Sequence, residues 1–508
     1  MPESAALARP KSLSAARAAA LILAGAIQTL AFAPWYYWPA TLVSFLVLVP
    51  LCLGRSSGAL FRDGWLVGFG LFGAGASWVY VSISEYGMTS APLAATLTLI
   101  FVAGLALFHA IGFWCWGRLG GDSRSRQLWL FPAVWVLIDW VRGWLFTGFP
   151  WLYAGTAQVD GPLAGWLPLL GVHGATLLTV ATAILLIVAV DRLRTARPQL
   201  AAAATGITLI PWIAGPLLQP LEWTEPDGEP LDVAAIQGNI SQHDKWDPAR
   251  AQEQIRIYQQ LSEPHWERDL ILWPETAIPA TQKQATAVLA ALDKHATETD
   301  TAVVTGIAWH GDSPRYPGKV FHNSLTTAGN ARGVYHKQRL VPFGEYVPFQ
   351  SLLRGTIEFF NLPMSVFRPG PQNQQPLRLA GVAVHPFICY EITYPDFVAR
   401  NTNATGFLLT VSNDAWFGRS IGPFQHQQIA RTRSVETGRA LLRGTNNGIT
   451  AIVDRNGAVS ARASQYERDS LAGSLQPVTG RTPFMMTGSW PVLTLAAVTI
   501  VFTRRRKR

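Results

Sequence analysis

The stretch His385-Pro-Phe-Ile-Cys-Tyr-Glu-Ile-Thr-Tyr-Pro-Asp396 decides the fold of the polar part of this chain. It completes the apolar run Gly381–Cys389, which predicts a buried strand, and it carries Pro395, which suits the first turn of a following helix. A strand that leads through a short loop into a helix is typical of an α/β domain. The thiol of Cys389 stands where the strand ends, a common position for catalytic side chains.

The same alternation of strands and helices extends over residues 220–484. Further apolar runs of strand length lie at 231–240, 269–273, 302–308, 406–411 and 449–453. Helical spacing with polar faces occurs at 248–261, 282–297 and 424–442. We therefore predict one α/β domain whose sheets are covered by helices. Because this part of the sequence has no glycine-rich phosphate loop and no metal-ligand cluster of credible spacing, we expect no cofactor and no metal.

The rest of the chain has the composition of a membrane protein. Of its 508 residues, 49% are hydrophobic and only 14% are charged, and the mean hydropathy is +0.18. A membrane-spanning helix needs about 20 apolar residues. Such stretches lie at 17–33, 38–53, 62–82, 92–116, 127–145, 163–190, 200–218 and 486–503. The second stretch is short, and Pro132, Asp139 and Arg142 interrupt the fifth.

We accordingly predict a polytopic α-helical membrane protein with about eight spans. Seven belong to a membrane domain over residues 1–219, and the last lies within residues 485–508 together with a basic tail. The polar α/β domain occupies residues 220–484 between them.

The basic residues predict the orientation of the spans. They gather in alternate connections, namely Arg9, Lys11 and Arg17, then Arg55 and Arg62, then Arg118, Arg124 and Arg126, then Arg192, Arg194 and Arg197, and finally the tail 504–508. Because basic loops stay in the cytoplasm, both termini are expected there and the α/β domain outside, in the periplasm of a bacterium with a cytoplasmic (inner) membrane. The net charge of +9 then reflects topology, and we expect no nucleic-acid partner.

Cys389 has no cysteine partner in its own domain, because the two others, Cys52 and Cys115, lie in apolar stretches. An unpaired thiol that faces an oxidising compartment is a liability unless it takes part in chemistry. A nearby helix N-terminus and a nearby cation would favour its thiolate. The alternative is that Cys389 is a small buried hydrophobic residue, which is the more common role of a free cysteine.

Two other segments place a reactive residue just after a predicted strand. They are Leu272-Trp-Pro-Glu275 and Tyr335-His-Lys337, and the second leads into Pro342-Phe-Gly-Glu345-Tyr-Val-Pro. Together with Cys389-Tyr-Glu391 they resemble the Glu–Lys–Cys signature of the nitrilase superfamily, over residues 230–475. With its flanking spans, the whole chain resembles the apolipoprotein N-acyltransferase family. Gln237-Gly-Asn-Ile, Lys245-Trp246-Asp-Pro and Ser412-Asn-Asp-Ala-Trp416-Phe-Gly support this resemblance.

The resemblance implies an α-β-β-α sandwich and a role for each site residue. Cys389 would be the nucleophile that forms a thioester, Glu275 the general base, and Lys337 the group that stabilises the oxyanion. Glu345 would support the site. Trp246, Tyr390 and Glu391 would shape or bind at the pocket; for Tyr390 and Glu391 the less favoured alternative is packing beside an essential residue.

The resemblance also implies the substrates. A membrane phospholipid would donate the acyl chain, and the α-amino group of the diacylglyceryl-cysteine that begins an apolipoprotein would accept it, in the last step of lipoprotein maturation. The enzyme would work by ping-pong kinetics, and we expect it to be a monomer.

Apolar residues that could form a lid facing the lipid, or could equally be ordinary core, are Phe343, Phe359, Phe360, Leu362 and Met364.

Two other classes of protein remain open at this point. A membrane-tethered amidohydrolase would keep the three reactive residues but release a free acid. A transporter with a non-catalytic domain would tolerate loss of Cys389, and the intact Glu–Lys–Cys set argues against it.

Overall fold

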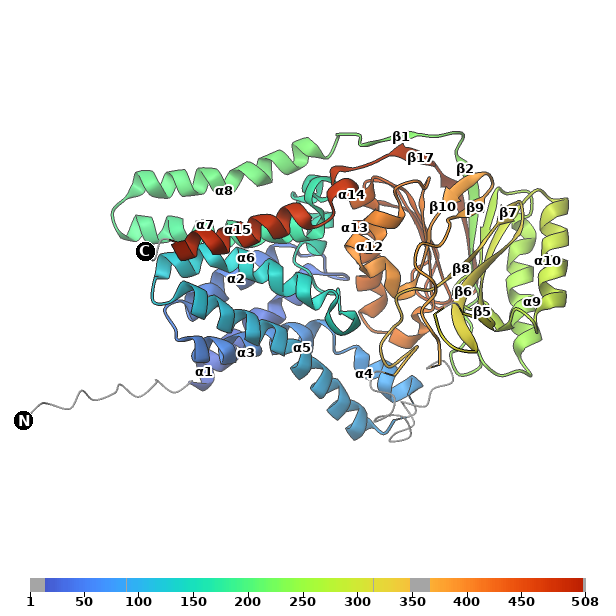
Figure 1. Ribbon diagram of the computed structural model, residues 1–508, viewed down its shortest axis with the longest axis horizontal. Coiled ribbons are helices and arrows are strands. Elements are labelled where there is room, and N and C mark those ends of the chain that lie inside the picture. The colour runs from blue at the N-terminus through green and yellow to red at the C-terminus, as the bar shows by residue number, and fades with distance from the viewer. Residues whose placement is uncertain (1–13, 88, 314, 348–365, 506–508) are drawn as a thin grey trace, which may run out of the picture.

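Apolar helices form a bundle at one end of the molecule, and β-sheets lie at the other end (Figure 1). The computed structural model describes residues 14–87, 89–313, 315–347 and 366–505. The long helices of the bundle are α1 (Ala15–Ala26), α2 (Pro39–Cys52), α3 (Ser57–Gly75), α5 (Ala91–Gly120), α6 (Arg124–Arg142), α7 (Leu167–Arg194), α8 (Pro198–Leu218) and α15 (Trp490–Arg505). Each of the eight predicted spans thus overlaps one of these long helices.

By length and composition alone, fewer of these helices qualify as membrane spans. Within the described residues three are long and apolar enough to cross a membrane: α5, α8, and α7 with the turn before it (Ala164–Arg194). Helix α3 and its continuation Val79–Tyr86 qualify together as a fourth, but they are bent by 63°. Helices α1, α2 and α15 are apolar but shorter, and α6 carries four charged residues. The count of eight spans therefore stays a prediction.

The bend after α3 divides the span predicted at 62–82. A side chain at Gly75 would overlap the side chain of Leu152, which belongs to the loop after α6. That loop therefore packs closely against the end of α3. The helix ends at this residue and the chain turns toward the sheets.

The polar domain contains two large sheets. One has the strand order β16-β2-β3-β5-β6-β8, with β4 paired to β5, and the other has the order β11-β12-β13-β14-β15. The strands of the first are β2 (Leu231–Gln237), β3 (Leu270–Leu272), β4 (Ile278–Thr281), β5 (Ala302–Asp312), β6 (Lys319–Gly329), β8 (Val334–His336) and β16 (Asp469–Leu475). Those of the second are β11 (Pro386–Ile388), β12 (Leu408–Ser412), β13 (Leu441–Thr445), β14 (Ala451–Val453) and β15 (Val459–Arg462).

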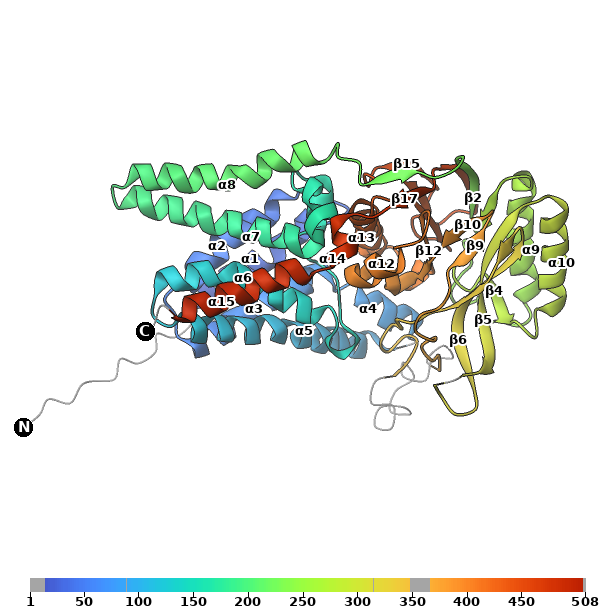
Figure 2. The same cartoon turned by 45° about the horizontal axis from the view of Figure 1, so that its top comes forward.

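Smaller sheets complete the domain. Strands β7 (Ala331–Arg332), β9 (Leu377–Leu379) and β10 (Val382–Val384) form a three-stranded sheet, and β1 (Thr224–Pro226) pairs with β17 (Val478–Gly480). Helices α9 (Ala251–Ser262) and α10 (Thr286–Glu298) lie beside the first large sheet. Helices α12 (Pro395–Asn401) and α13 (Gly422–Thr437) lie beside the second (Figure 2).

Three apolar cores hold these layers together. Between the sheets, Val233 and Leu272 of the first meet Ile388 and Leu409 of the second. The other face of the first sheet packs against α9 and α10. The other face of the second sheet packs against α12 and α13, for example through Leu408. This order of layers confirms the predicted α-β-β-α sandwich.

Two predicted elements end earlier than expected. The strand predicted at Gly381–Cys389 is divided at His385, so that β10 joins the three-stranded sheet and β11 the five-stranded one. The helix predicted at 424–442 ends at Thr437, because Gly438 takes a left-handed conformation with a φ of 61° that terminates helices. Residues 441–445 instead form strand β13.

The bundle and the sandwich share one apolar core. Phe72 and Trp151 of the bundle pack in the same cluster as Phe387 and Ile429 of the sandwich. Figure 2 shows α12 and α13 between the bundle and the sheets. The face of the sandwich that carries α12 and α13 is therefore the face that meets the bundle.

Candidate active site

The candidate residues follow the carboxyl ends of strands, where α/β enzymes place their catalytic groups. Lys337 comes directly after β8, Cys389 directly after β11 and Asn413 directly after β12, and Glu275 lies shortly after β3. Strands β11 and β12 are parallel neighbours in one sheet, and β3 and β8 belong to the other. The stacking of the two sheets therefore brings together residues that are far apart in the sequence.

Lys337 lies between two carboxylates. Its ammonium nitrogen Nζ is 2.9 Å from Glu345 Oε2 and 3.3 Å from Glu275 Oε1. The amide of Asn323 joins the same carboxylates, since Nδ2 donates to Glu275 Oε1 at 2.6 Å and to Glu345 Oε1 at 2.8 Å. All four side chains are buried. The predicted residues Glu275, Lys337 and Glu345 thus form one hydrogen-bonded cluster.

Backbone amides also hold one oxygen of each carboxylate. The N–H of Asn413 donates to Glu275 Oε2 at 2.8 Å, and the N–H of Val341 donates to Glu345 Oε2 at 2.8 Å. Burial lowers the pKa of Lys337, but the charges of Glu275 and Glu345 outweigh it and hold that pKa well above its usual range. Lys337 is therefore a fixed cation, suited to stabilising negative charge and unsuited to donating a proton.

The thiol of Cys389 is neutral at rest. Burial raises its pKa, the charge of Glu275 raises it further, and Lys337 only partly opposes them. The expectation that its surroundings favour the thiolate is therefore wrong: burial and the carboxylate outweigh the cation. A base must take the proton when the sulfur attacks, and Glu275 is the carboxylate whose charge Cys389 feels most strongly.

The backbone at Cys389 is strained. Its φ is 53°, in the left-handed region that residues other than glycine rarely occupy. Its carbonyl oxygen lies 3.2 Å from His426 Nε2. His426 Nδ1 in turn lies 3.1 Å from Asp414 Oδ1 and 3.2 Å from Arg443 Nη2, and Arg443 donates to Asp414 Oδ2 at 2.8 Å. A buried cluster of charged and polar groups thus supports the turn that carries the thiol.

His426 in this cluster is neutral, because burial and the charge of Arg443 lower its pKa. A neutral imidazole has one N–H. With that proton on Nε2, His426 donates to the carbonyl oxygen of Cys389 and Nδ1 accepts from Arg443; with it on Nδ1, His426 donates to Asp414 Oδ1 instead. The first tautomer is the one that holds the Cys389 peptide.

Glu391 has its carboxylate turned to the backbone. Its Oε1 accepts from the N–H groups of Gln338 at 2.6 Å and Arg339 at 3.1 Å and from the hydroxyl of Tyr335 at 2.9 Å, and its Oε2 accepts from the N–H of Ile388 at 2.8 Å. Burial raises the pKa of Glu391 to about 7, although these donors oppose the shift. Glu391 therefore ties the loop after Lys337 to the strand that precedes Cys389.

Tyr390 points to the bundle. Its hydroxyl donates to the carbonyl oxygen of Gly148 at 2.8 Å, and its ring stacks with that of Trp151 at a centroid distance of 6.5 Å. The next tyrosine, Tyr394, donates to the carbonyl oxygen of Thr147 at 2.7 Å. The loop after α6 is therefore attached to the turn that follows Cys389.

Trp246 packs beside the site without a hydrogen bond. Its ring lies against the apolar cluster of Ala308, Leu340 and Phe367, and its Nε1 has no partner among the described residues. Of the residues predicted to form a lid, Phe343 is described, whereas Phe359, Phe360, Leu362 and Met364 lie outside the described residues.

Sequence reasoning missed several residues of the site. Asn323 was missed because β6 was not predicted. Lys245 was missed although the segment that contains it was quoted. The ammonium of Lys245 donates to the carbonyl oxygen of Glu275 at 3.0 Å, and burial lowers its pKa to about 8. Asn413 and Asp414 stand in the quoted segment 412–418, so the sequence resemblance could have pointed to them. Nothing in the sequence pointed to His426 or Arg443. Within the described residues no cluster of His, Cys, Asp and Glu could hold a metal ion.

Comparison with known proteins agrees with this geometry. Residues 232–483 match the family described as carbon-nitrogen hydrolase, and residues 24–185 match the family described as the apolipoprotein N-acyltransferase N-terminal domain. The sandwich is thus a carbon-nitrogen hydrolase domain, and it is joined to a bundle of apolar helices that has a family of its own.

Similarity over nearly the full length identifies the family of the chain. The apolipoprotein N-acyltransferase of Pseudomonas aeruginosa (strain UCBPP-PA14) is 43% identical over 95% of this chain and 94% of its own. Those of Pseudomonas syringae pv. tomato (44%, covering 93% of each chain) and Coxiella burnetii (39%, covering 95% of this chain and 98% of its own) are similar. The chain belongs to the apolipoprotein N-acyltransferase family.

Proposed function

We propose that this protein transfers a fatty acyl chain from a membrane phospholipid to the α-amino group of the diacylglyceryl-cysteine that begins an apolipoprotein. The observation that carries the proposal is the buried Glu275–Lys337–Glu345 cluster beside the neutral thiol of Cys389. Membership in the family supports the substrates. The bundle supports them as well, because substrates with acyl chains reach an enzyme by diffusing in the bilayer.

The first half-reaction forms a thioester. Glu275 takes the proton of the Cys389 thiol as the sulfur bonds to the ester carbonyl carbon of the phospholipid. Lys337 stabilises the negative charge that develops on the carbonyl oxygen, and as a fixed cation it needs no proton transfer to do so. The carbon–oxygen bond then breaks, and the proton held by Glu275 passes to the oxygen of the departing lysophospholipid.

The second half-reaction repeats these steps with an amine. The α-amino nitrogen of the lipoprotein attacks the thioester carbonyl, and Glu275 accepts a proton from it. The carbon–sulfur bond breaks, and the sulfur of Cys389 regains a proton as the amide is released. The other residues support this reaction without taking part in it. Glu345 orients Lys337, whereas Glu391 and Tyr390 position the turn at Cys389. Trp246 shapes the wall beside that turn.

We further propose the placement of the chain in the bacterial cytoplasmic membrane. Residues 1–219 form the membrane domain with seven spans, residues 220–484 the periplasmic catalytic domain, and residues 485–508 the last span and a cytoplasmic tail. The start of α1, the end of α15 and the α7–α8 turn lie at the end of the bundle farthest from the sheets, which supports this placement (Figure 1). We propose that the enzyme works as a monomer, without a nucleic-acid partner.

The test is mass spectrometry of the full-length protein after incubation with phospholipid alone. An acyl mass should appear on Cys389, and the Cys389→Ala protein should gain none. A peptide that begins with diacylglyceryl-cysteine should then discharge the adduct and become an amide, whereas the same peptide acetylated at its amino group should leave the adduct in place.

The same experiment separates the proposal from the amidohydrolase alternative. If water discharges the adduct as fast as the peptide does, the protein is a hydrolase. If the Cys389→Ala protein still acylates the peptide at the normal rate, the thioester mechanism is wrong.

A further inference from the structure

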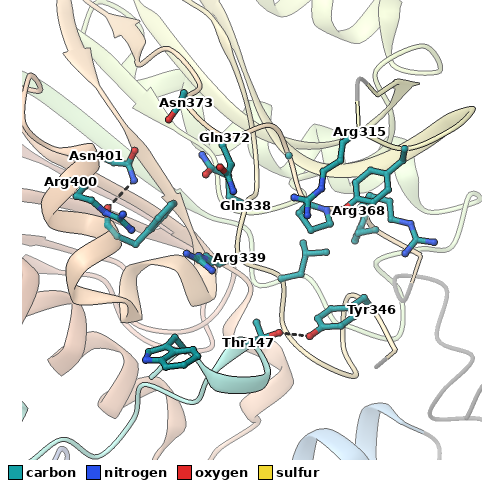
Figure 3. Close-up of a pocket in the computed structure, with 17 residues that line it drawn as sticks. Thr147, Arg315, Gln338, Arg339, Tyr346, Arg368, Gln372, Asn373, Arg400 and Asn401 are labelled. Carbon is teal, nitrogen blue, oxygen red and sulfur yellow. Dashed lines mark hydrogen bonds between the residues drawn. The ribbon is translucent and has the colours of Figure 1, made fainter. Parts of the chain in front are cut away.

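A cavity of about 780 Å³ lies where the catalytic domain meets the bundle (Figure 3). Residues 338–340, which directly follow Lys337, form part of its wall, and Trp144 and Thr147 of the loop after α6 form another part. Glu275, Lys337 and Cys389 are not among its lining residues. It is therefore a separate cavity that borders the loop carrying the fixed cation.

The cavity wall is strongly positive. Arg315, Arg339, Arg368 and Arg400 line it, and among the described residues that line it there is no Asp or Glu. Within the described part of the chain none of the four arginines forms an ion pair with a carboxylate. Elsewhere in the described residues, ten contacts join an arginine to a carboxylate, for example Arg142 to Asp139 and Arg431 to Asp160. Unpaired arginines that share a cavity repel one another, and an anion relieves that repulsion.

The arginines are arranged around the cavity. Arg339 lies between Arg400 on one side and Arg315 and Arg368 on the other (Figure 3). Aromatic rings hold three of them: the guanidinium of Arg339 lies 5.5 Å from the ring centroid of Tyr394, and those of Arg315 and Arg368 each lie 5.6 Å from that of Tyr316. Planar guanidinium groups fixed in this way suit bidentate hydrogen bonds to phosphate oxygens.

The position of the cavity points to a lipid rather than to a soluble anion. Trp144 is 50% exposed, and Phe146 on the same loop is 79% exposed, as expected for aromatic side chains at the surface of a bilayer. Arg339 follows Lys337 by two residues, so their Cα atoms are at most about 7 Å apart. A phosphodiester held by Arg339 is separated from its acyl esters only by the glycerol carbons.

We propose that this cavity binds the phosphodiester of the phospholipid that donates the acyl chain, with Arg339 at its centre. The proposal rests on the proposed function and names where the donor is held. The hydrogen bond from the N–H of Arg339 to Glu391, at 3.1 Å, joins the cavity wall to the turn that carries Cys389. The bound headgroup thus determines where the ester lies relative to the thiol.

The kinetic test measures the rate at which the full-length protein forms the acyl-enzyme in mixed micelles without peptide. The mole fraction of phosphatidylglycerol in the micelles is varied. The double variant Arg368→Gln/Arg400→Gln removes two exposed charges, so the fold is retained, and it should raise the KM for phospholipid about tenfold or more. The maximal rate should change by less than roughly twofold, because the reacting groups are intact. Arg339→Gln should raise the same KM.

Arg256→Gln is the matched control. Arg256 is an exposed arginine of α9, the helix that covers the outer face of the first large sheet. Arg256 does not line the cavity, so its loss should leave the KM for phospholipid unchanged. An unchanged KM in the double variant overturns the proposal. A KM that rises for the lipopeptide in the second half-reaction, and not for phospholipid, also overturns it, because the cavity would then hold the acceptor.

A binding test does not depend on catalysis. The Cys389→Ala protein is titrated with dihexanoyl phosphatidylglycerol and, separately, with inorganic phosphate, and binding is followed by the ³¹P NMR line width. The lipid should bind, and the double arginine variant should weaken its binding about tenfold. Binding of inorganic phosphate alone overturns the lipid assignment. If wild-type protein forms no thioester but this lipid binding is lost in the variant, the proposed function fails while the headgroup site stands.

Discussion

Glu275 and Lys337 have opposite effects on the thiol, although both are expected to accelerate its acylation. The carboxylate raises the pKa of Cys389 and the ammonium lowers it. A mechanism in which a resting thiolate attacks would need only the ammonium. The neutral thiol of this site needs the carboxylate as a base as well, and the two roles can be separated by measuring the titration of the thiol and its acylation independently.

The first prediction concerns this separation. Glu275→Gln removes a negative charge and should move the titration of Cys389 to lower pH, whereas Lys337→Met should move it to higher pH. Acylation should nevertheless fall in both, by about 10²–10⁴ without the base and about 10²–10³ without the cation. The measurements are the pH dependence of alkylation by iodoacetamide and the rate of thioester formation. Shifts of the titration in the same direction would contradict the electrostatics described above.

The second prediction concerns the support of Cys389 by His426. His426→Leu removes the donor to the Cys389 carbonyl, so the strained turn should relax and the sulfur should move away from the attacking position. We expect thioester formation to slow about 10²-fold, the cost of a small misplacement, with little change in the KM for phospholipid. His426→Gln can donate from a similar position and should restore most of the rate. Equal losses in both variants would show that the role is one of packing alone.

At the scale of elements, the hydrogen bonds of Glu391 connect two segments that are distant in sequence. The loop after β8 and the end of β11 both donate to one buried carboxylate. The loop carries Lys337 and the strand carries Cys389, so the distance between cation and thiol depends on this carboxylate. These hydrogen bonds favour a positioning role for Glu391 over direct substrate binding.

The third prediction follows from this arrangement. Glu391→Gln keeps the shape but replaces one acceptor oxygen by an NH₂ group, which must face a backbone N–H. We expect a lower free energy of unfolding, by about 1–3 kcal/mol, and slower thioester formation. Thermal unfolding and adduct mass spectrometry measure the two effects. Tyr335→Phe, which removes one donor and leaves the carboxylate, is the control and should be milder. A Glu391→Gln protein with normal stability and a raised KM would instead indicate direct substrate binding.

The sequence was informative about elements and less so about their contacts. Strand ends could be located from the apolar runs before Glu275 and Cys389, but the set of Glu275, Lys337 and Cys389 was identified through its resemblance to the Glu–Lys–Cys signature of the nitrilase superfamily. Asn323 was not, since β6 lacks a clear apolar run, and its amide meets Glu275 and Glu345 only when β6, β8 and the loops fold together. The ionisation of Cys389 was predicted wrongly for the same reason: burial is a property of the packed structure.

At the scale of the whole molecule, the bundle takes part in building the site. Arg142 of α6 pairs with Asp139 at 2.7 Å and donates to the carbonyl oxygens of Phe149 at 2.6 Å and Trp151 at 2.7 Å. The Asp139–Arg142 pair thus fixes the loop that Tyr390 binds. The membrane part thus supports the catalytic turn in addition to placing it near lipid.

The last prediction concerns the orientation of the whole chain. Ion pairs join the helix ends far from the sheets, for example Arg17 and Arg55 with Asp63, and Arg124 with Asp191. The excess of arginine in these connections predicts that they face the cytoplasm and that the catalytic domain faces the periplasm. In a protein without its native cysteines, Ser313→Cys should react with a membrane-impermeant maleimide on intact spheroplasts, and Arg194→Cys only after permeabilisation. Because Ser313 and Arg194 belong to opposite ends of the molecule, labelling of Arg194→Cys alone on intact cells would reverse the orientation, and with it the compartment in which the acyl transfer takes place.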